Sequence, residues 1–242
     1  MKRVFFFPDM HVPYHDNRAT NLAIKAAKQF KPDIVVMLGD VGDFYAVSRH
    51  IRTPDRERLL KREISSVKAV LKKIEEINAS EYIFIAGNHE HRLNRYLCEK
   101  APELYGMLEI PDILDIQDWD YVPYGEGVML GKLYVTHDVG YSGKSALQQS
   151  QAALGGSIII GHTHRMGSTY PGFMDGTRLT AQSFGWLGDF RAITEYKQLV
   201  RARREWCHGF GVAHIEDNGY AHVRGVPIFR NRCVVDGKLI QL

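Results

Sequence analysis

The residues VFFFPDMH at positions 4–11 and IVVMLGDVGD at positions 34–43 decide the fold. Each stretch begins with a short, uninterrupted apolar run, which is typical of a strand buried on both faces, and each continues into acidic or imidazole side chains. Between them, residues 17–30 carry apolar side chains at helical spacing, including Leu22, Ala26 and Phe30. This strand–helix–strand order predicts neighbouring parallel strands.

The same pattern continues along the chain. A second helix is predicted from about residue 56 to residue 77, and further apolar runs predict strands at 82–86, 133–136 and 157–160. From Tyr170 onward, alternating runs are separated by turn residues, and Asn218-Gly219 predicts a hairpin. We therefore expect a second, more antiparallel sheet, built from this later part, to pack on the first.

Composition narrows the class of protein. The 242 residues are 45% hydrophobic and 24% charged, with no linker-like stretch, which predicts one globular domain over residues 1–242. No apolar run is long enough to span a membrane, and the three cysteines form no CxxC pair, so we expect a cytoplasmic protein without disulfides or a thiolate metal site. The net charge of +3 is too small to indicate nucleic-acid binding by itself.

Side chains that commonly bind metals follow each of the five apolar runs. In chain order, the clusters are Pro8-Asp9-Met10-His11, Gly39-Asp40-Val41-Gly42-Asp43, Gly87-Asn88-His89-Glu90, His137-Asp138 and Gly161-His162-Thr163-His164. The carboxyl ends of parallel strands form the ligand-binding edge of an α/β sheet, so we expect these clusters to meet there. Each motif alone is weak, but five in succession after strands indicate one site.

The types of side chain indicate which chemistry such a site supports. Imidazole, carboxylate and amide ligands without a thiolate suit manganese, iron or zinc. One aspartate can bridge two cations about 3.5–4 Å apart, which would produce a bridging hydroxide directed at a phosphorus atom. The sequence therefore predicts two divalent ions, with manganese expected and iron or zinc as alternatives.

The motif order DxH, GDxxD, GNHE, a lone histidine and GHTH resembles the calcineurin-like metallophosphoesterases. The resemblance runs from Asp9 to His164, about two thirds of the chain. It implies an α/β fold: a four-layer αββα sandwich of two mixed β-sheets flanked by helices. It also implies a first metal held by Asp9, His11, Asp40 and His164, and a second held by Asp40, Asn88, His137 and His162. By the same resemblance, His89 would donate a proton or stabilise the transition state, and Asp43 would orient its ring.

One departure from the family pattern and one match to it bear on the substrate. Many phosphomonoesterases of the family have arginine directly after the second aspartate of GDxxD, whereas this chain has Phe44. In contrast, His91-Arg92 after GNHE fits their pattern, and Arg92 is a candidate phosphate-binding residue. A dianionic terminal phosphate benefits most from guanidinium contacts, so Phe44 favours a phosphodiester.

Basic residues near the motifs have two interpretations. They could form a positive rim that attracts a polyanion, or they could be the solvated face of a helix, which we favour for residues 58–73. The residues concerned are Arg49, Arg52, Arg56, Arg58, Lys61, Arg62, Arg92, Arg95, Arg165, Arg201, Arg203 and Arg204.

Three functions remain open from the sequence. The first is a dinuclear phosphodiesterase or nuclease acting on nucleic acid or nucleotides, and the second is a phosphomonoesterase of proteins or nucleotides. The third is a binding scaffold that has kept the fold and lost catalysis, which the complete set of competent side chains disfavours. No membrane partner is expected, and the sequence does not indicate an oligomeric state.

Overall fold

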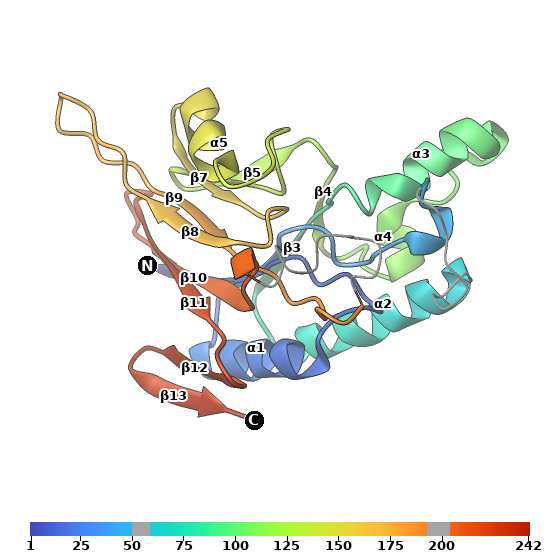
Figure 1. Cartoon of the computed structure of the whole chain (residues 1–242), viewed down its shortest axis with the longest axis horizontal. Coiled ribbons are helices and arrows are strands. Elements are labelled where there is room, and N and C mark those ends of the chain that lie inside the picture. The colour runs from blue at the N-terminus through green and yellow to red at the C-terminus, as the bar shows by residue number, and fades with distance from the viewer. Residues whose placement is uncertain (50–58, 193–203) are drawn as a thin grey trace.

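The computed structural model describes residues 1–49, 59–192 and 204–242. Two large sheets face each other, with α1 (Asn17–Phe30) and α2 (Leu60–Glu75) outside one sheet and α5 (Ala146–Leu154) outside the other (Figure 1). This arrangement confirms the predicted αββα fold class. The chain within residues 50–58, where the second helix was predicted to begin, lies outside the described residues.

The first sheet combines parallel and antiparallel strands. β1 (Lys2–Phe7), β2 (Ile34–Met37), β3 (Glu81–Ile85) and β4 (Asp120–Val122) are parallel neighbours in that order. On the other side of β1, β10 (Gly209–Ile215) pairs antiparallel with it, and β11 (Ala221–Pro227) pairs antiparallel with β10. The carboxyl ends of β1, β2 and β3 therefore point to the same edge.

The second sheet has the order β5-β6-β7-β9-β8. Its strands are β5 (Gly127–Leu130), β6 (Leu133–Thr136), β7 (Ser157–Ile160), β8 (Met166–Thr169) and β9 (Ala181–Phe184). β6, β7 and β9 are parallel, and the outer strands β5 and β8 are antiparallel to their neighbours.

The remaining described elements are shorter or peripheral. They are α3 (His91–Lys100), α4 (Ile110–Leu114), the 3₁₀ turns η1 (Tyr45–Val47) and η2 (Pro102–Leu104), and the hairpin of β12 (Arg232–Val235) with β13 (Lys238–Gln241). Among the helices of the described ranges, none combines the length and apolar character that crossing a bilayer requires.

The prediction of how the strands divide between the sheets was wrong. The fourth and fifth apolar runs, β6 and β7, belong to the second sheet, and the hairpin around Asn218-Gly219 extends the first. The reason is that β10 is buried on both faces: Phe210 and Val212 pack toward the helices, while Ala213 and Ile215 pack toward the second sheet. A strand with apolar side chains on both of its sides fits inside the sandwich, beside β1. In an antiparallel sheet with one face in water, a strand would need apolar side chains on one side only.

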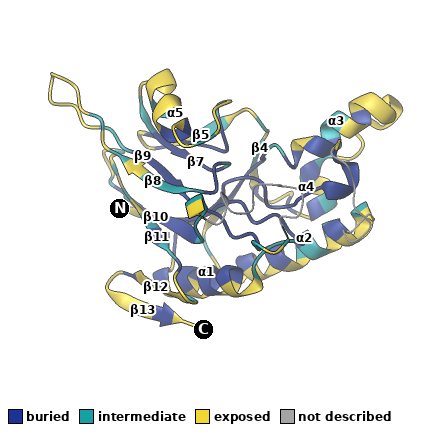
Figure 2. Ribbon diagram, in the orientation of Figure 1, coloured by how far each residue is buried: buried dark blue, intermediate teal, exposed yellow. Residues whose placement is uncertain are grey.

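Successive side chains of β1 point alternately into two separate hydrophobic cores. Phe5 and Phe7 join the core beneath α1 and α2, whereas Val4 and Phe6 join the core between the sheets. Figure 2 shows the central strands buried, and the outer faces of the helices and parts of the peripheral strands exposed. Full burial of each such side chain contributes about 1.5–3 kcal/mol, so four consecutive apolar residues hold the strand that positions Asp9.

Candidate metal centre

Five loops converge where strands of both sheets end. The loops follow β1, β2 and β3 of the first sheet and β6 and β7 of the second. All the predicted ligands lie in these loops, and their donor atoms form two groups that share Asp40. The clusters were expected at the edge of one sheet, but they come together from the facing ends of two.

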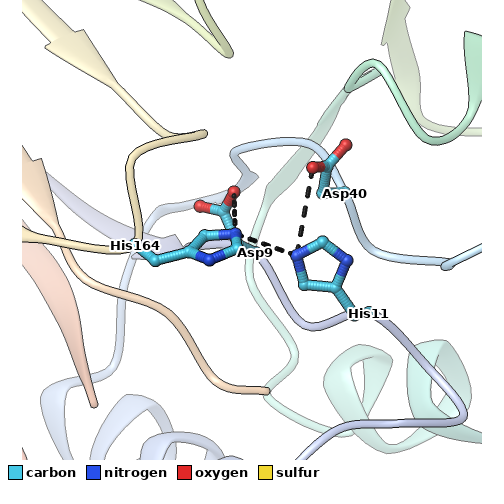
Figure 3. Close-up of side chains that lie close together, drawn as sticks. All are labelled: Asp9, His11, Asp40 and His164. Carbon is cyan, nitrogen blue, oxygen red and sulfur yellow. Dashed lines mark hydrogen bonds and ion pairs between the residues drawn. The ribbon is translucent and has the colours of Figure 1, made fainter. Parts of the chain in front are cut away.

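The first group contains Asp9, His11, Asp40 and His164, whose side chains point toward one another in Figure 3. The Nε2 atoms of His11 and His164 are 3.0 Å apart. His164 Nε2 is also 3.5 Å from Asp9 Oδ1, and His11 Nε2 is 3.9 Å from Asp40 Oδ2. Two imidazole nitrogens and two carboxylates thus face a common point.

The second group contains Asp40, Asn88, His137 and His162. Asn88 Oδ1 is 3.2 Å from His137 Nε2 and 2.9 Å from His162 Nδ1, and His137 Nε2 is 3.4 Å from Asp40 Oδ1. The other ring nitrogen of His137 lies 2.7 Å from the carbonyl of Leu38 and can donate a hydrogen bond to it. That tautomer directs the Nε2 lone pair of His137 into the group, which is how metal-binding histidines are commonly oriented.

The donor set fits a pair of cations. Ligands about 2.0–2.2 Å from a metal lie about 3–3.6 Å from one another, and five of the six separations above are within about 0.1 Å of that range. Asp9 is completely buried, its Oδ2 has no hydrogen-bond partner among the described residues, and burial raises the pKa of its carboxyl to about 6. An adjacent cation would satisfy this oxygen and favour the ionised carboxylate.

The backbone around the two groups is strained. His11, Asp40, His162 and His164 have φ values of 55°, 49°, 63° and 57°, which is uncommon for residues other than glycine. Strained conformations of this kind cost about 1–3 kcal/mol each and tend to occur at functional sites. Space is equally restricted: a Cβ at Gly87 would lie 2.2 Å from Asp40 Oδ1, so the loop approaches the shared aspartate only with glycine there.

Asp43, His89 and Arg92 form a buried unit beside the first group. His89 Nδ1 lies 3.0 Å from the Asp43 carbonyl and can donate to it, and Arg92 Nη1 donates to the same carbonyl at 2.9 Å. Arg92 Nη2 is 2.9 Å from His89 Nε2, and the Arg92 side chain is almost completely buried. Arg92 therefore contacts Asp43 and His89 in this structure.

Charge within this unit favours an ionised pair. Burial by itself would lower the pKa of His89, but the carboxylates of Asp40 and Asp43 outweigh it and raise that pKa. Burial would likewise raise the pKa of Asp43, but His89 and His11 hold it well below its usual range. The two carboxylates therefore favour the imidazolium form of His89, whereas Arg92 opposes it, because its charge lowers this pKa and its Nη2 can only donate to the Nε2 lone pair.

Two buried glutamates support the site and were not singled out from the sequence. Glu90 accepts backbone hydrogen bonds from Asp40 (3.0 Å), Gly42 (2.9 Å) and Gly87 (2.8 Å), which ties the second loop to the third. Glu63, on α2, accepts from the amide of Tyr45 at 3.0 Å and supports the turn directly after Asp43. The signals in the sequence were weak. Glu63 is an acidic residue among the apolar positions of the second predicted helix, and Glu90 is the last residue of the GNHE motif.

Aromatic packing also orients one predicted ligand. The His164 ring stacks on Trp186 with centroids 4.9 Å apart and meets the edge of Trp206 at 4.3 Å. Neither tryptophan was connected to the metal site by the sequence. Their packing restricts the ring of His164 to one orientation.

The predicted positive rim is only partly described. Within the described ranges, Arg49 pairs with Glu99, and Arg165 is neutralised by Glu205, whose Oε2 accepts from Arg165 Nε at 3.2 Å. Lys144 also reaches Glu205, at 3.0 Å. Five of the predicted rim residues lie outside the described residues: Arg52, Arg56, Arg58, Arg201 and Arg203.

Known proteins resemble this chain over most of its length. The Gene 54 protein of Mycobacterium phage D29 is 26% identical over 260 residues, covering 98% of this chain and 97% of the relative, and that of Mycobacterium phage L5 is 25% identical over 255 residues, covering 98% of both. Among solved structures, wild-type Vps29 of Entamoeba histolytica complexed with zinc is 15% identical (TM-score 0.48, 98% and 95% coverage). The nuclease MPE of Pseudomonas putida is 14% identical (TM-score 0.38, 99% and 87% coverage).

The model of the calcineurin-like phosphoesterases matches residues 2–166. The match begins with β1 and includes every residue of the two groups that share Asp40. It covers more than half of the sequence and confirms the predicted resemblance. The chain therefore belongs to the calcineurin-like phosphoesterase family.

Proposed function

We propose that this protein is a dinuclear, metal-dependent phosphodiesterase that hydrolyses a phosphodiester in a nucleic acid or nucleotide. The observation that carries the proposal is the pair of donor groups sharing Asp40, whose Oδ1 faces His137 and whose Oδ2 faces His11. One carboxylate with an oxygen in each group is the arrangement expected of a bridging ligand.

Seven residues would hold the ions. Asp9, His11, Asp40 and His164 would hold one, and Asp40, Asn88, His137 and His162 the other, with manganese as the proposed metal and iron or zinc as alternatives. When bound, two divalent ions supply Lewis-acid polarisation of the phosphoryl oxygens and activation of a water molecule at neutral pH.

The Asp43–His89–Arg92 unit would handle the leaving group. The raised pKa of His89 would favour a proton on Nε2 once Arg92 no longer donates to that nitrogen, and the ring could then give this proton to the departing oxygen or share it with the phosphoryl group. Asp43 orients the ring through its backbone carbonyl and stabilises the charged form. Arg92 holds both and would add positive charge beside the phosphate.

A diester fits the available cationic groups better than a terminal phosphate does. Phe44 is fully buried where many phosphomonoesterases carry arginine, and Arg92 is already bound to Asp43. A monoanionic diester needs fewer guanidinium contacts than a dianionic monoester. The second candidate, a phosphomonoesterase, is favoured by the 2.9 Å approach of Arg92 Nη2 to His89, because a small rotation would bring this group to a substrate oxygen.

Two measurements test the proposal. Hydrolysis of bis-p-nitrophenyl phosphate and of p-nitrophenyl phosphate should be compared with added manganese, and we expect faster hydrolysis of the diester. A large preference for the monoester would support the second candidate instead. Activity should disappear with a chelator and return with manganese. A purified protein that neither binds divalent ions nor hydrolyses either ester would be a scaffold, and the proposal would be wrong.

A further inference from the structure

A cavity of about 590 Å³ lies at the opposite ends of the strands from the metal centre. Its lining includes Leu133 and Ser157, the first residues of β6 and β7, whereas His137 and His162 follow the last residues of the same strands. Four residues of strand at about 3.3 Å each separate the two places by roughly 13 Å. The cavity is therefore distinct from the metal centre.

Both sheets contribute to the walls. The β8–β9 loop supplies Thr177 to Thr180, and the β10–β11 hairpin supplies Tyr220 to Arg224. Figure 1 shows that loop projecting on the same side of the molecule as the N-terminus. The walls are tied together, since the Lys132 amide donates to the Gly219 carbonyl at 2.8 Å and the Thr180 amide donates to Ser157 Oγ at 3.2 Å.

Two exposed tyrosines stand at the cavity in ordered positions. Tyr170 is 65% exposed, yet its hydroxyl accepts a hydrogen bond from Nε2 of the buried Gln182 at 3.1 Å. Tyr220 is 54% exposed, and Lys132 Nζ lies 3.9 Å from its ring centroid. Ordered, solvent-facing rings present flat apolar surfaces on which a planar ligand can stack.

The charged groups of the lining are mostly cationic. They are Lys132, Arg178, Arg224 and Asp236. Asp236 is shared between Arg3 at 3.4 Å and Arg224 at 3.6 Å. Lys132 and Arg178 have no carboxylate partner in the described part of the chain, so both cations remain available to an anion.

We propose that this cavity binds a small aromatic anion of the nucleotide class, with the planar ring against Tyr170 or Tyr220 and the phosphate against Lys132 and Arg178. The cavity volume lies within the range of about 300–1,000 Å³ that small-molecule sites occupy. Leu133, Leu179 and Val212 contribute apolar atoms to the lining, and Leu179 is the partly exposed one of the three. The site is separate from the phosphodiesterase centre and does not depend on its metals.

Calorimetric titration with a non-hydrolysable phosphonate analogue of AMP tests the proposal. The double variant K132E/R178E should lose affinity at least tenfold, because two cations become two anions at the phosphate position. The control K72E reverses the charge of an exposed lysine on α2 and should bind the analogue as the wild type does.

The variant D40N, which disables the metal centre, should keep one binding site for the analogue. Thermal unfolding of each variant verifies that it is folded, and R178A provides a milder second variant that should weaken binding in the same direction.

Several outcomes would overturn the inference. Wild-type affinity in K132E/R178E, loss of all binding in D40N, or no binding by the wild-type protein at millimolar analogue would each exclude an anion site in this cavity. Inorganic phosphate binding as tightly as the nucleotide analogue would exclude the aromatic part of the proposal. Because D40N removes metal-centre function independently, failure here is distinguishable from failure of the proposed phosphodiesterase activity.

Discussion

Replacing Glu63 by glutamine should make the stability of the protein less sensitive to pH. The Glu63 side chain is 1% exposed, and burial together with the charge of Asp43 raises its pKa from the ordinary value of 4.5 to about 7. A carboxyl group whose pKa is higher in the folded state stabilises that state when protonated. Its contribution is therefore complete below about pH 4.5 and is lost as the pH rises through about 7.

The size of the effect follows from the two pKa values. One pKa unit corresponds to about 1.4 kcal/mol, and linkage over the interval from pH 5 to pH 8 gives a loss of about 2–3 kcal/mol in wild-type stability through this group. Glutamine does not titrate, so E63Q should lack this component. Any constant cost of replacing an oxygen that accepts from Tyr45 cancels when the two pH values are compared.

Urea unfolding of wild type and E63Q at pH 5 and pH 8 measures this difference directly. The stability of E63Q relative to wild type should increase by about 2–3 kcal/mol between the two pH values. E75Q, which changes an exposed glutamate near the end of the same helix, is the matched control and should show a much smaller change. An E63Q curve parallel to the wild-type curve would refute the reasoning that burial and Asp43 disfavour the ionised form.

Three further predictions concern the metal centre. Asp40→Asn should abolish hydrolysis and weaken both metal sites, since its two oxygens face the two groups; two tightly bound ions per chain, measured by elemental analysis, would contradict this. His89→Gln should keep the metal content and lower turnover by about 10²–10⁴, the range for loss of a general acid, and unchanged steady-state turnover would rule out that role. Glu90→Gln should weaken manganese binding by about 10–100-fold, because the amide nitrogen that replaces one carboxylate oxygen cannot accept, so either the bond from Gly42 or those from Asp40 and Gly87 are lost. Titration with manganese would test this, and wild-type affinity would show that the loops keep their positions without the carboxylate.

Much of the fold could be predicted because its signals are local. α1 spans Asn17–Phe30 as predicted, where the Asp16 side chain accepts from the amides of Arg18 and Ala19 at the helix start. β6 and β7 also match their predicted bounds. Such elements depend on periodicity and capping within about fifteen residues, so the sequence alone contains the necessary information.

The partners of the strands could not be predicted in the same way. β10 lies about two hundred residues from β1, and pairing between them depends on which apolar surfaces meet in three dimensions. The supporting roles of Glu63 and Glu90 could not be predicted for the same reason. A buried carboxylate is recognisable only once the backbone amides that bind it have been positioned by the fold.

The sequence by itself determined α1, the strands that carry the motifs and the set of metal-seeking side chains, because strand and helix periodicities and motif spacing are properties of the local chain; the αββα fold class followed from the family resemblance. Tertiary structure decided that β6 and β7 face β1, β2 and β3 from a second sheet, and that Asp40 turns one oxygen toward each donor group. It also decided which cationic side chains are already paired within the protein, since Arg165 and Arg92 acquire acidic partners that lie about forty to fifty residues away in the sequence. These outcomes depend on contacts between distant segments, which only the folded chain brings within hydrogen-bonding range.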